Sequence, residues 1–236
     1  MLSEHNKALL KKVSTATLAT ALFKRGFKQQ FIQDVRPLGP LQESMVGVAF
    51  TLRYMPARED LDTLNSFRER GHLQRQAVET CPPGAVLVID SRKDARAASA
   101  GGILVTRLMQ RGVAGVVTDG GFRDSFEIAG LGIPAFHNRP SAPTNLTLHH
   151  AIAINDPIGC GDAPVFPGDI IVGDADGVIV VPLHLADEIA EEAASMTLFE
   201  DFVTAQVKTG ATILGLYPPT DPKSLQKFEV WKQDQS

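Results

Sequence analysis

Two charged side chains, Arg123 and Asp124, follow two glycines directly after a short apolar run, within Thr118-Asp-Gly-Gly-Phe-Arg-Asp124. A guanidinium offers a planar pair of donors to a carboxylate, and an aspartate is a hard oxygen ligand for Mg²⁺. Glycines let the backbone approach a ligand closely. These residue types suit a site for a small carboxylic acid and a divalent metal. The alternative is a surface loop with a solvated Arg–Asp pair.

A second candidate is the glycine pair Gly101-Gly102, followed by Ile103 and Leu104 at the start of a predicted helix. Free N–H groups at a helix N-terminus attract anions, and glycines leave that end sterically open. If the strands before the two features are neighbours, both features lie at one sheet edge. They would then hold a carboxylate or 2-oxo acid beside a metal. The alternative is a glycine pair used only for close packing.

Glu200 is a third candidate, on a long predicted helix. It lies four residues after Met196 and three before Val203, on a stripe of apolar residues. A carboxylate on a buried face needs a partner, such as an arginine, a metal-bound water or a neighbouring subunit. The alternative is a stripe that meets solvent at this turn.

The elements around these residues predict an α/β fold. Residues 85–90 and 113–119 are short apolar runs typical of buried strands, and a helix over 99–111 is ended by Gly112. Strand, helix and strand in about 35 residues form a βαβ unit. Outside this unit, we expect an N-terminal helix capped by Ser14 or Thr15 and two further helices at 60–80 and 184–209. Strands are expected at 46–54 and 133–136, and a hairpin is expected to join 169–172 with 178–181. The proline-rich tail is expected to form a short helix or to wrap a neighbouring subunit.

Composition limits the possible functions. The chain has 236 residues, a formal net charge of -4 and no basic run, which argues against a nucleic-acid partner. Its two cysteines, Cys81 and Cys160, exclude a disulfide scaffold and fit a reducing cytoplasm. The sequence shows neither a signal peptide nor an apolar run long enough to span a membrane. We therefore expect a cytoplasmic protein without membrane or nucleic-acid partners.

The sequence resembles the RraA-like family, which contains the regulators of ribonuclease activity A and the class II 4-hydroxy-4-methyl-2-oxoglutarate aldolases. The resemblance covers most of the chain and is most specific over Gly101-Gly-Ile-Leu104 and Gly112-Val-Ala-Gly-Val-Val-Thr-Asp-Gly-Gly-Phe-Arg-Asp124. It implies an α/β fold of the swivelling β/β/α type, assembled as a homotrimer or homohexamer. One domain is expected over 1–236, with a core of about 14–210, helical extensions at both ends and a C-terminal extension over 211–236.

The resemblance also implies an activity. The family's aldolases use Mg²⁺ or Mn²⁺ to cleave 2-oxo-4-hydroxy acids to pyruvate, and they decarboxylate oxaloacetate through the same enolate. Carried over by position, Asp124 would be the metal ligand. Arg123 and the backbone of Gly101, Gly102, Ile103 and Leu104 would bind the pyruvate moiety. Glu200 would act in catalysis from across a subunit interface.

Gly102 departs from the aldolase pattern, which has an acidic residue at this position, twenty residues before Arg-Asp. The regulators without aldolase activity lose the aspartate that this chain keeps as Asp124. A metal-dependent lyase acting on a small 2-oxo acid is therefore favoured. Two alternatives stay open: a non-enzymatic regulator that binds a protein such as a ribonuclease, and a dehydratase or hydrolase that acts on a sugar acid at the same metal site.

Overall fold

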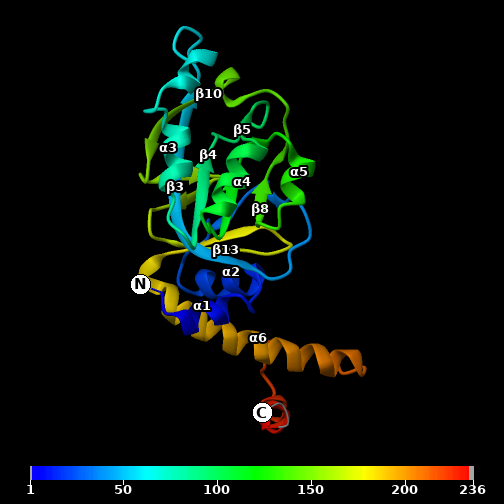
Figure 1. Cartoon of the computed structure of the whole chain (residues 1–236). Helices are drawn as coiled ribbons and strands as arrows, with labels where there is room; N and C mark the ends of the chain where they lie inside the picture. Colours follow the sequence, from blue (N-terminus) through cyan, green and yellow to red (C-terminus); the bar gives the residue numbers. More distant parts are fainter. Residues whose placement is uncertain (1, 234–236) are drawn as a thin grey trace.

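The computed structural model describes residues 2–233 (Figure 1). Within them, nine strands form a mixed, curled sheet in the order β1-β14-β13-β3-β4-β6-β8-β2, with β10 paired to β3. The strands are β1 (Phe31–Ile32), β2 (Arg36–Pro37), β3 (Met45–Pro56), β4 (Ala85–Asp90), β6 (Gly115–Thr118), β8 (Ala135–His137), β10 (His149–Ile154), β13 (Ile170–Gly173) and β14 (Val178–Val181). Strands β3, β4, β6 and β8 are parallel, and the other pairings are antiparallel.

Two small sheets accompany this main sheet. One is parallel and contains β5 (Ala98–Ala100), β7 (Gly121–Phe122) and β9 (Arg139–Pro140). The other is a hairpin of β11 (Ile158–Cys160) and β12 (Ala163–Val165). The β5-β7-β9 sheet positions the candidate residues, because β5 leads into Gly101-Gly102 and β7 leads into Arg123-Asp124.

Helices cover the main sheet in two groups (Figure 1). One group is α3 (Leu73–Thr80), α4 (Gly102–Gln110) and α5 (Ser125–Ala129), whose apolar residues share a core with β4 and β6. The other group is α1 (Glu4–Leu10), α2 (Thr15–Lys24) and α6 (Ala186–Lys208), packed on β13 and β14. Short 3₁₀ helices lie at Leu64–Arg68, Asn145–Thr147 and Leu183–Leu185, and α7 (Pro222–Gln233) follows α6.

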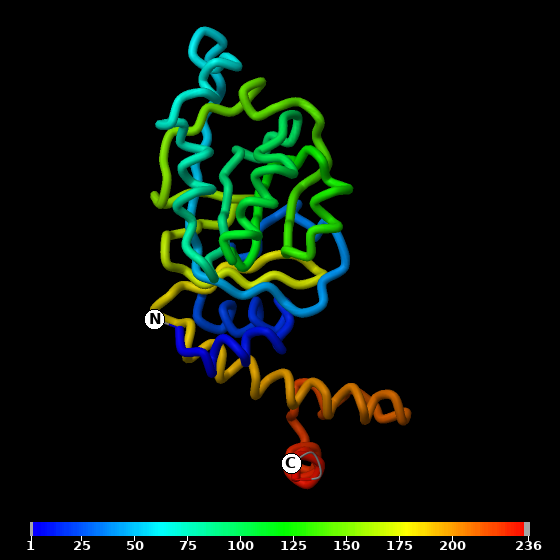
Figure 2. The backbone as a smooth tube through the Cα atoms, viewed as in Figure 1, coloured from blue at the N-terminus to red at the C-terminus, as the bar shows by residue number. Residues whose placement is uncertain are grey.

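The N-terminal helices lie beside the first half of α6, although the two segments are far apart in sequence (Figure 2). Asn6 Nδ2 donates a 2.6 Å hydrogen bond to Asp187 at the start of α6. The second half of α6 extends beyond the sheet, and Phe228 and Trp231 of α7 pack against Phe202 there. Of the two expectations for the tail, the short helix is confirmed.

Most predicted elements are confirmed. Strand β4 has the predicted bounds, β13 and β14 form the predicted antiparallel hairpin, and Ser14 caps α2 by accepting a hydrogen bond from the Thr17 amide. Among residues 2–233, no helix is long and apolar enough to cross a membrane.

The helix predicted over 60–80 is wrong in its first half. Residues 57–63 form turns, in which the Arg58 amide donates to the Asp62 carboxylate at 2.8 Å, and α3 begins only at Leu73. Leu61 and Leu64 are 50% and 74% exposed, so their helical spacing does not reflect a buried face. Spacing alone cannot separate apolar residues that reach the core from those that stay at the surface.

The helix predicted over 99–111 begins three residues late. Ala98–Ala100 forms strand β5, which pairs with β7, and α4 starts at Gly102. The Ser99 carbonyl accepts hydrogen bonds from the Tyr54 hydroxyl at 2.9 Å and from Gln74 Nε2 at 2.7 Å. Small side chains at Ala98, Ser99 and Ala100 allow this close packing, which local helix signals do not reveal.

Candidate active site

The two glycine-containing motifs meet at one sheet edge, as the neighbouring strands require. Strands β4 and β6 are parallel neighbours, so their carboxyl ends lie together. Beyond that edge, β5 leads into α4 and β7 leads into Arg123. The Arg123 amide donates to the Ala100 carbonyl at 3.1 Å, which fixes the second motif against the first.

Asp124 is held by the start of α4. Its Oδ2 accepts a 3.0 Å hydrogen bond from the Gly102 amide and lies 3.7 Å from Arg123 Nε. The Asp124 backbone is left-handed, with a φ of 58°, a conformation that aspartate tolerates better than most residues. Both side chains stay about half exposed, at 47% for Arg123 and 42% for Asp124. The pair is therefore positioned by backbone contacts and still open to a ligand.

Gly101 allows the Arg123 side chain to pass directly over the backbone. A Cβ at position 101 would lie 2.6 Å from Arg123 Cγ and 3.0 Å from Asp124 Oδ2. Distances this short exclude any side chain without displacement of the pair. Gly101 is therefore needed for close packing, and the group that packs against it is the candidate functional pair itself.

The first turn of α4 keeps one free donor. The Gly102 amide donates to Asp124, while the Leu104 and Val105 amides donate to the Gly101 carbonyl. The Ile103 amide has no acceptor among residues 2–233. Ile103 helps to line a pocket of about 250 Å³, together with Gly101, Leu104, Arg123 and Asp124. A free N–H and a guanidinium at one pocket are suited to binding a carboxylate.

Buried polar residues lie at the carboxyl ends of β4, β5 and β6 and join the loops that follow β4 and β6. The hydroxyls of Ser91, Ser99 and Thr118 lie within hydrogen-bonding distance of one another, with Ser91 to Ser99 at 2.6 Å and Ser99 to Thr118 at 2.7 Å. Asp119 accepts hydrogen bonds from the amides of Ser91, Lys93 and Gly161. Burial raises the pKa of Asp119 to about 6. Asp119 therefore ties together the loops after β4 and β6, and it does not line the pocket.

The chemistry of the donor set agrees with a magnesium-type ion. Among residues 2–233, no cluster of three or more His, Cys, Asp or Glu residues could form a cage of protein ligands. Mg²⁺ needs no such cage, because it keeps several waters and binds one or two carboxylates. Asp124 has one oxygen occupied by the Gly102 amide and its other oxygen without a partner in the described chain. Asp124 could therefore hold such an ion.

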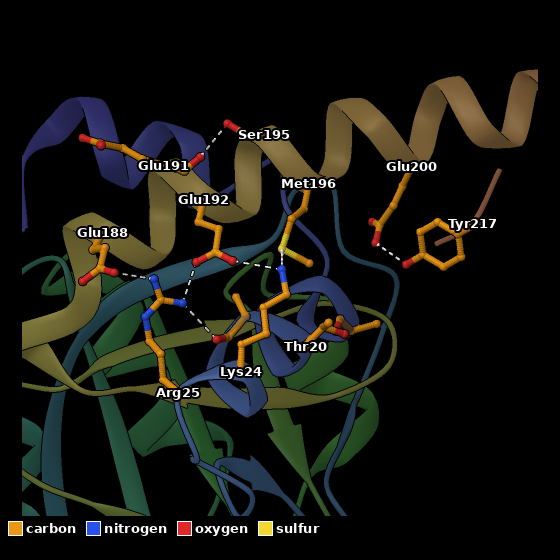
Figure 3. A network of polar contacts seen from close by, with 12 residues as sticks. Thr20, Lys24, Arg25, Glu188, Glu191, Glu192, Ser195, Met196, Glu200 and Tyr217 are labelled. Carbon is orange, nitrogen blue, oxygen red and sulfur yellow. Dashed lines mark hydrogen bonds and ion pairs between the residues drawn. The ribbon is translucent and has the colours of Figure 1, made fainter. Parts of the chain in front are cut away.

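Glu200 does not reach this pocket within one chain. It lies on the extended half of α6, where it accepts a hydrogen bond from the Tyr217 hydroxyl at 3.1 Å (Figure 3). A second hydrogen bond, of 2.8 Å, comes from Thr17 Oγ1. Ion pairs of Lys24 and Arg25 with Glu192 hold the preceding turns of α6 to α2. The Glu200 side chain is half-buried, and its partners are hydroxyls that the apolar stripe does not predict.

Three further residues at the pocket have no sequence motif. Gln74 and Arg75 come from α3, and Asn145 begins the 3₁₀ helix at Asn145–Thr147. They enter the pocket because β3 and β10 pair and bring their flanking loops together. Only the fold places them beside Arg123.

The sequence profile of the RraA-like family, described as Aldolase/RraA, matches residues 15–180. The chain belongs to the RraA-like family. A putative 4-hydroxy-4-methyl-2-oxoglutarate aldolase of Halalkalibacterium halodurans is 36% identical over 118 residues, which cover 50% of this chain and 56% of that relative. The matched region thus spans about half the length of this curated relative.

Solved structures share the fold of this RraA-like chain. A crystal structure of an uncharacterized protein from Pseudomonas syringae pv. tomato has a TM-score of 0.78 at 22% identity, covering 90% of this chain and 92% of that one. RraAS2 of Streptomyces coelicolor, described as an unusual member of the RNase ES inhibitor RraA protein family, has a TM-score of 0.75 at 29% identity, covering 85% and 96%. The expected α/β fold of the RraA-like type is confirmed.

Proposed function

We propose that this chain is a divalent-metal-dependent lyase that acts on a small 2-oxo acid and releases pyruvate through an enolate. One observation carries this proposal: Arg123, Asp124 and Ile103, whose amide has no acceptor among residues 2–233, line one pocket. The naming of relatives as putative aldolases supports the same reaction class. Two buried free cysteines in the described chain, Cys81 and Cys160, support a cytoplasmic location.

In the proposed complex, different residues bind the substrate and the metal. The Ile103 amide and the Arg123 guanidinium bind the 1-carboxylate and the 2-oxo oxygen of the substrate. As the bond beyond C3 breaks, negative charge grows on the 2-oxo oxygen, and Arg123 stabilises that charge at a position fixed by Gly101. Bound at Asp124, Mg²⁺ or Mn²⁺ would supply Lewis-acid polarisation of the same oxygen.

Aldol cleavage requires one more group than decarboxylation. To break the C3–C4 bond, a base must take the proton of the 4-hydroxyl, whereas oxaloacetate loses CO₂ without giving up a proton. Asp124 is the pocket's single carboxylate among residues 2–233, and we assign it to the metal. We propose that Glu200 of a second copy of the chain supplies or orients this base.

This role for Glu200 implies a homo-oligomer, and we propose a homotrimer or homohexamer. The projecting half of α6 that carries Glu200 extends away from its own sheet (Figure 1). Ile103, which lines the pocket, and Phe126, which follows Asp124 by two residues, are 85% and 91% exposed. Large apolar side chains exposed beside a polar pocket favour coverage by another chain.

The test is pyruvate release from oxaloacetate and from 4-hydroxy-2-oxo acids, measured with Mg²⁺, with Mn²⁺ and with excess chelator. We expect turnover with either metal, and loss of turnover with chelator. The Asp124→Asn variant keeps a side chain that tolerates left-handed backbone and can still accept the Gly102 hydrogen bond. Asp34→Asn is the matched control, because Asp34 is also left-handed and is exposed elsewhere. Activity unaffected by chelator and by Asp124→Asn would refute the proposal.

A non-enzymatic regulator is the second candidate. It is favoured by Gly102, which leaves the pocket with one carboxylate, and by the description of RraAS2 as a member of a ribonuclease-inhibitor family. In that case, the purified chain would bind and inhibit a ribonuclease and would turn over no 2-oxo acid. Turnover without any effect on ribonuclease activity would exclude it.

A further inference from the structure

Glu200 differs from two other glutamates of α6 in the kind of partner that it has. Glu188 forms an ion pair with Arg25, and Glu192 forms ion pairs with Lys24 and Arg25 (Figure 3). Within residues 2–233, no lysine or arginine forms an ion pair with Glu200. A carboxylate without a cationic partner keeps a negative charge that no neighbour neutralises. Such a carboxylate is suited to taking or directing a proton.

Two hydroxyl groups hold the Glu200 carboxylate, one on each oxygen. The Tyr217 hydroxyl donates to Oε1 at 3.1 Å, and the Thr17 hydroxyl donates to Oε2 at 2.8 Å. Partial burial and the neighbouring Glu200 raise the pKa of Tyr217, so its hydroxyl keeps the proton that it donates. A glutamate side chain has several rotamers, and donors on both oxygens restrict them. The carboxylate is therefore fixed in one orientation.

The C-terminal extension places Tyr217 against α6. Leu216 is 6% exposed and lies in one apolar cluster with Phe202 and Val203 of α6. The Tyr217 ring stacks on Phe199, with the ring centroids 6.5 Å apart and the ring planes inclined by 24°. Aromatic residues of α7 pack on the same side chains of α6. The extension is thus anchored on the helical turn that carries the glutamate.

We propose that Tyr217 is a positioning residue, whose hydroxyl holds the Glu200 carboxylate in the orientation that serves the pocket of a second copy of the chain. This role rests on the proposed function, in which Glu200 supplies or orients the base for aldol cleavage. Tyr217 does not line the pocket of its own chain, and it acts on the reaction only through Glu200. Its effect should therefore vanish when Glu200 is replaced.

The test removes the hydroxyl and keeps the ring. Tyr217→Phe retains the stacking on Phe199 and loses the hydrogen bond to Glu200. Steady-state kinetics of the full chain with Mg²⁺ and 4-hydroxy-4-methyl-2-oxoglutarate should show a kcat about tenfold below wild type at an unchanged KM, because a misplaced carboxylate slows the step without altering substrate contacts. Decarboxylation of oxaloacetate, which needs no base, should keep its kcat.

Two further proteins separate positioning from a structural role. Thr220→Val is the matched control, because it removes another exposed hydroxyl from the same extension, and it should change neither reaction. The double variant Tyr217→Phe/Glu200→Gln should cleave the hydroxy acid no more slowly than Glu200→Gln alone, since residues that act as one unit are not additive. Size-exclusion chromatography should give the same assembly for all variants.

Several results would overturn the role of Tyr217 alone. Aldol cleavage by Tyr217→Phe at the wild-type kcat is one. An equal loss of both reactions, or a further loss on top of Glu200→Gln, would assign Tyr217 to folding or assembly instead. Wild type that decarboxylates oxaloacetate without cleaving the hydroxy acid would also overturn this role, and the chain would still be a lyase. Pyruvate released from neither substrate would overturn the role of Tyr217 and the proposed function together.

Discussion

The Gly102 amide donates a 3.0 Å hydrogen bond to the Oδ2 atom of Asp124, joining the first residue of α4 to the residue that caps α5. A Cβ at position 102 would lie 3.3 Å from Asp124 Cβ and 3.5 Å from its Oδ2. The acidic residue of the resembled aldolases would therefore stand directly beside Asp124. Gly102 carries no charge, so Asp124 is the single carboxylate residue that lines the pocket among residues 2–233.

Restoring the acid should strengthen metal binding. In Gly102→Asp, a second carboxylate beside Asp124 would add a ligand or orient metal-bound waters, and we expect about tenfold tighter Mg²⁺ binding. Titration calorimetry with MgCl₂ measures this directly. Gly102→Ala is the control, with the same Cβ and no charge. Equal Mg²⁺ affinity in the two variants would show that the metal does not lie between these positions.

Adding a methyl group at Gly101 should damage the site far more than adding one at Gly102. The new Cβ of Gly101→Ala would meet Arg123 Cγ at 2.6 Å and must displace it, whereas Gly102→Ala makes contacts of 3.3 Å or longer. We expect kcat/KM for pyruvate release to fall by about a hundredfold in Gly101→Ala, since small displacements of positioning groups have such effects. A decrease in kcat/KM of only a few-fold would mean that the reaction does not depend on the observed position of the Arg123 side chain.

Replacing Glu200 should separate the two reactions. Glu200→Gln removes the charge needed for proton transfer, so aldol cleavage should slow by about 10²–10⁴-fold. Decarboxylation of oxaloacetate should change little, because it needs no base. Glu191→Gln, an exposed glutamate on the same helix, should affect neither reaction. Parallel loss of both activities would assign Glu200 to assembly or folding, which size-exclusion chromatography would reveal.

Two buried groups predict opposite pH effects on stability. Burial lowers the pKa of His137 to about 4, below the ordinary 6.5. The contribution of His137 to the free energy of unfolding is therefore present above pH 6.5 and lost as pH falls towards 4. Burial raises the pKa of Asp119 to about 6, above the ordinary 3.8. The contribution of Asp119 to the free energy of unfolding is therefore present below pH 3.8 and lost as pH rises through 6. Across pH 4–6 the two largely cancel.

Single substitutions should expose each effect. From pH 4 to 6.5, wild type should gain about 3 kcal/mol in unfolding free energy relative to His137→Phe, because the substitution removes the imidazole that protonates more readily in the unfolded chain. Relative to Asp119→Asn, wild type should lose stability as pH rises from 4 to 6. Urea denaturation at several pH values measures both. Differences that do not change with pH would contradict the assigned burial.

Sequence patterns predicted the parts of the fold that local rules determine. Short apolar runs indicated β4, and glycine turns indicated the β13–β14 hairpin, since both depend on neighbouring residues. Sequence patterns do not predict strand β5, because Ala98-Ser-Ala100 has no apolar signal and pairs with β7 only in the folded chain. Long-range pairing of this kind leaves no local pattern.

The sequence predicts only the part of the candidate site that belongs to the glycine-containing motifs. Arg123, Asp124 and Gly101 are adjacent in sequence to recognisable glycine turns, and the structure brings them together. Arg75 and Asn145 stand in segments without a motif and meet the pocket through tertiary packing. Among residues 2–233, Asn145 Nδ2 has no hydrogen-bond partner, a property that a sequence cannot display.

The most direct test of the central claim is metal-dependent pyruvate release by wild type, Asp124→Asn and Asp34→Asn, each with Mg²⁺ and with chelator. The account predicts robust turnover by wild type and Asp34→Asn with Mg²⁺. It predicts turnover lowered by about 10²–10³-fold in Asp124→Asn and under chelator. Equal turnover by all three proteins, or turnover that persists in chelator, would contradict it.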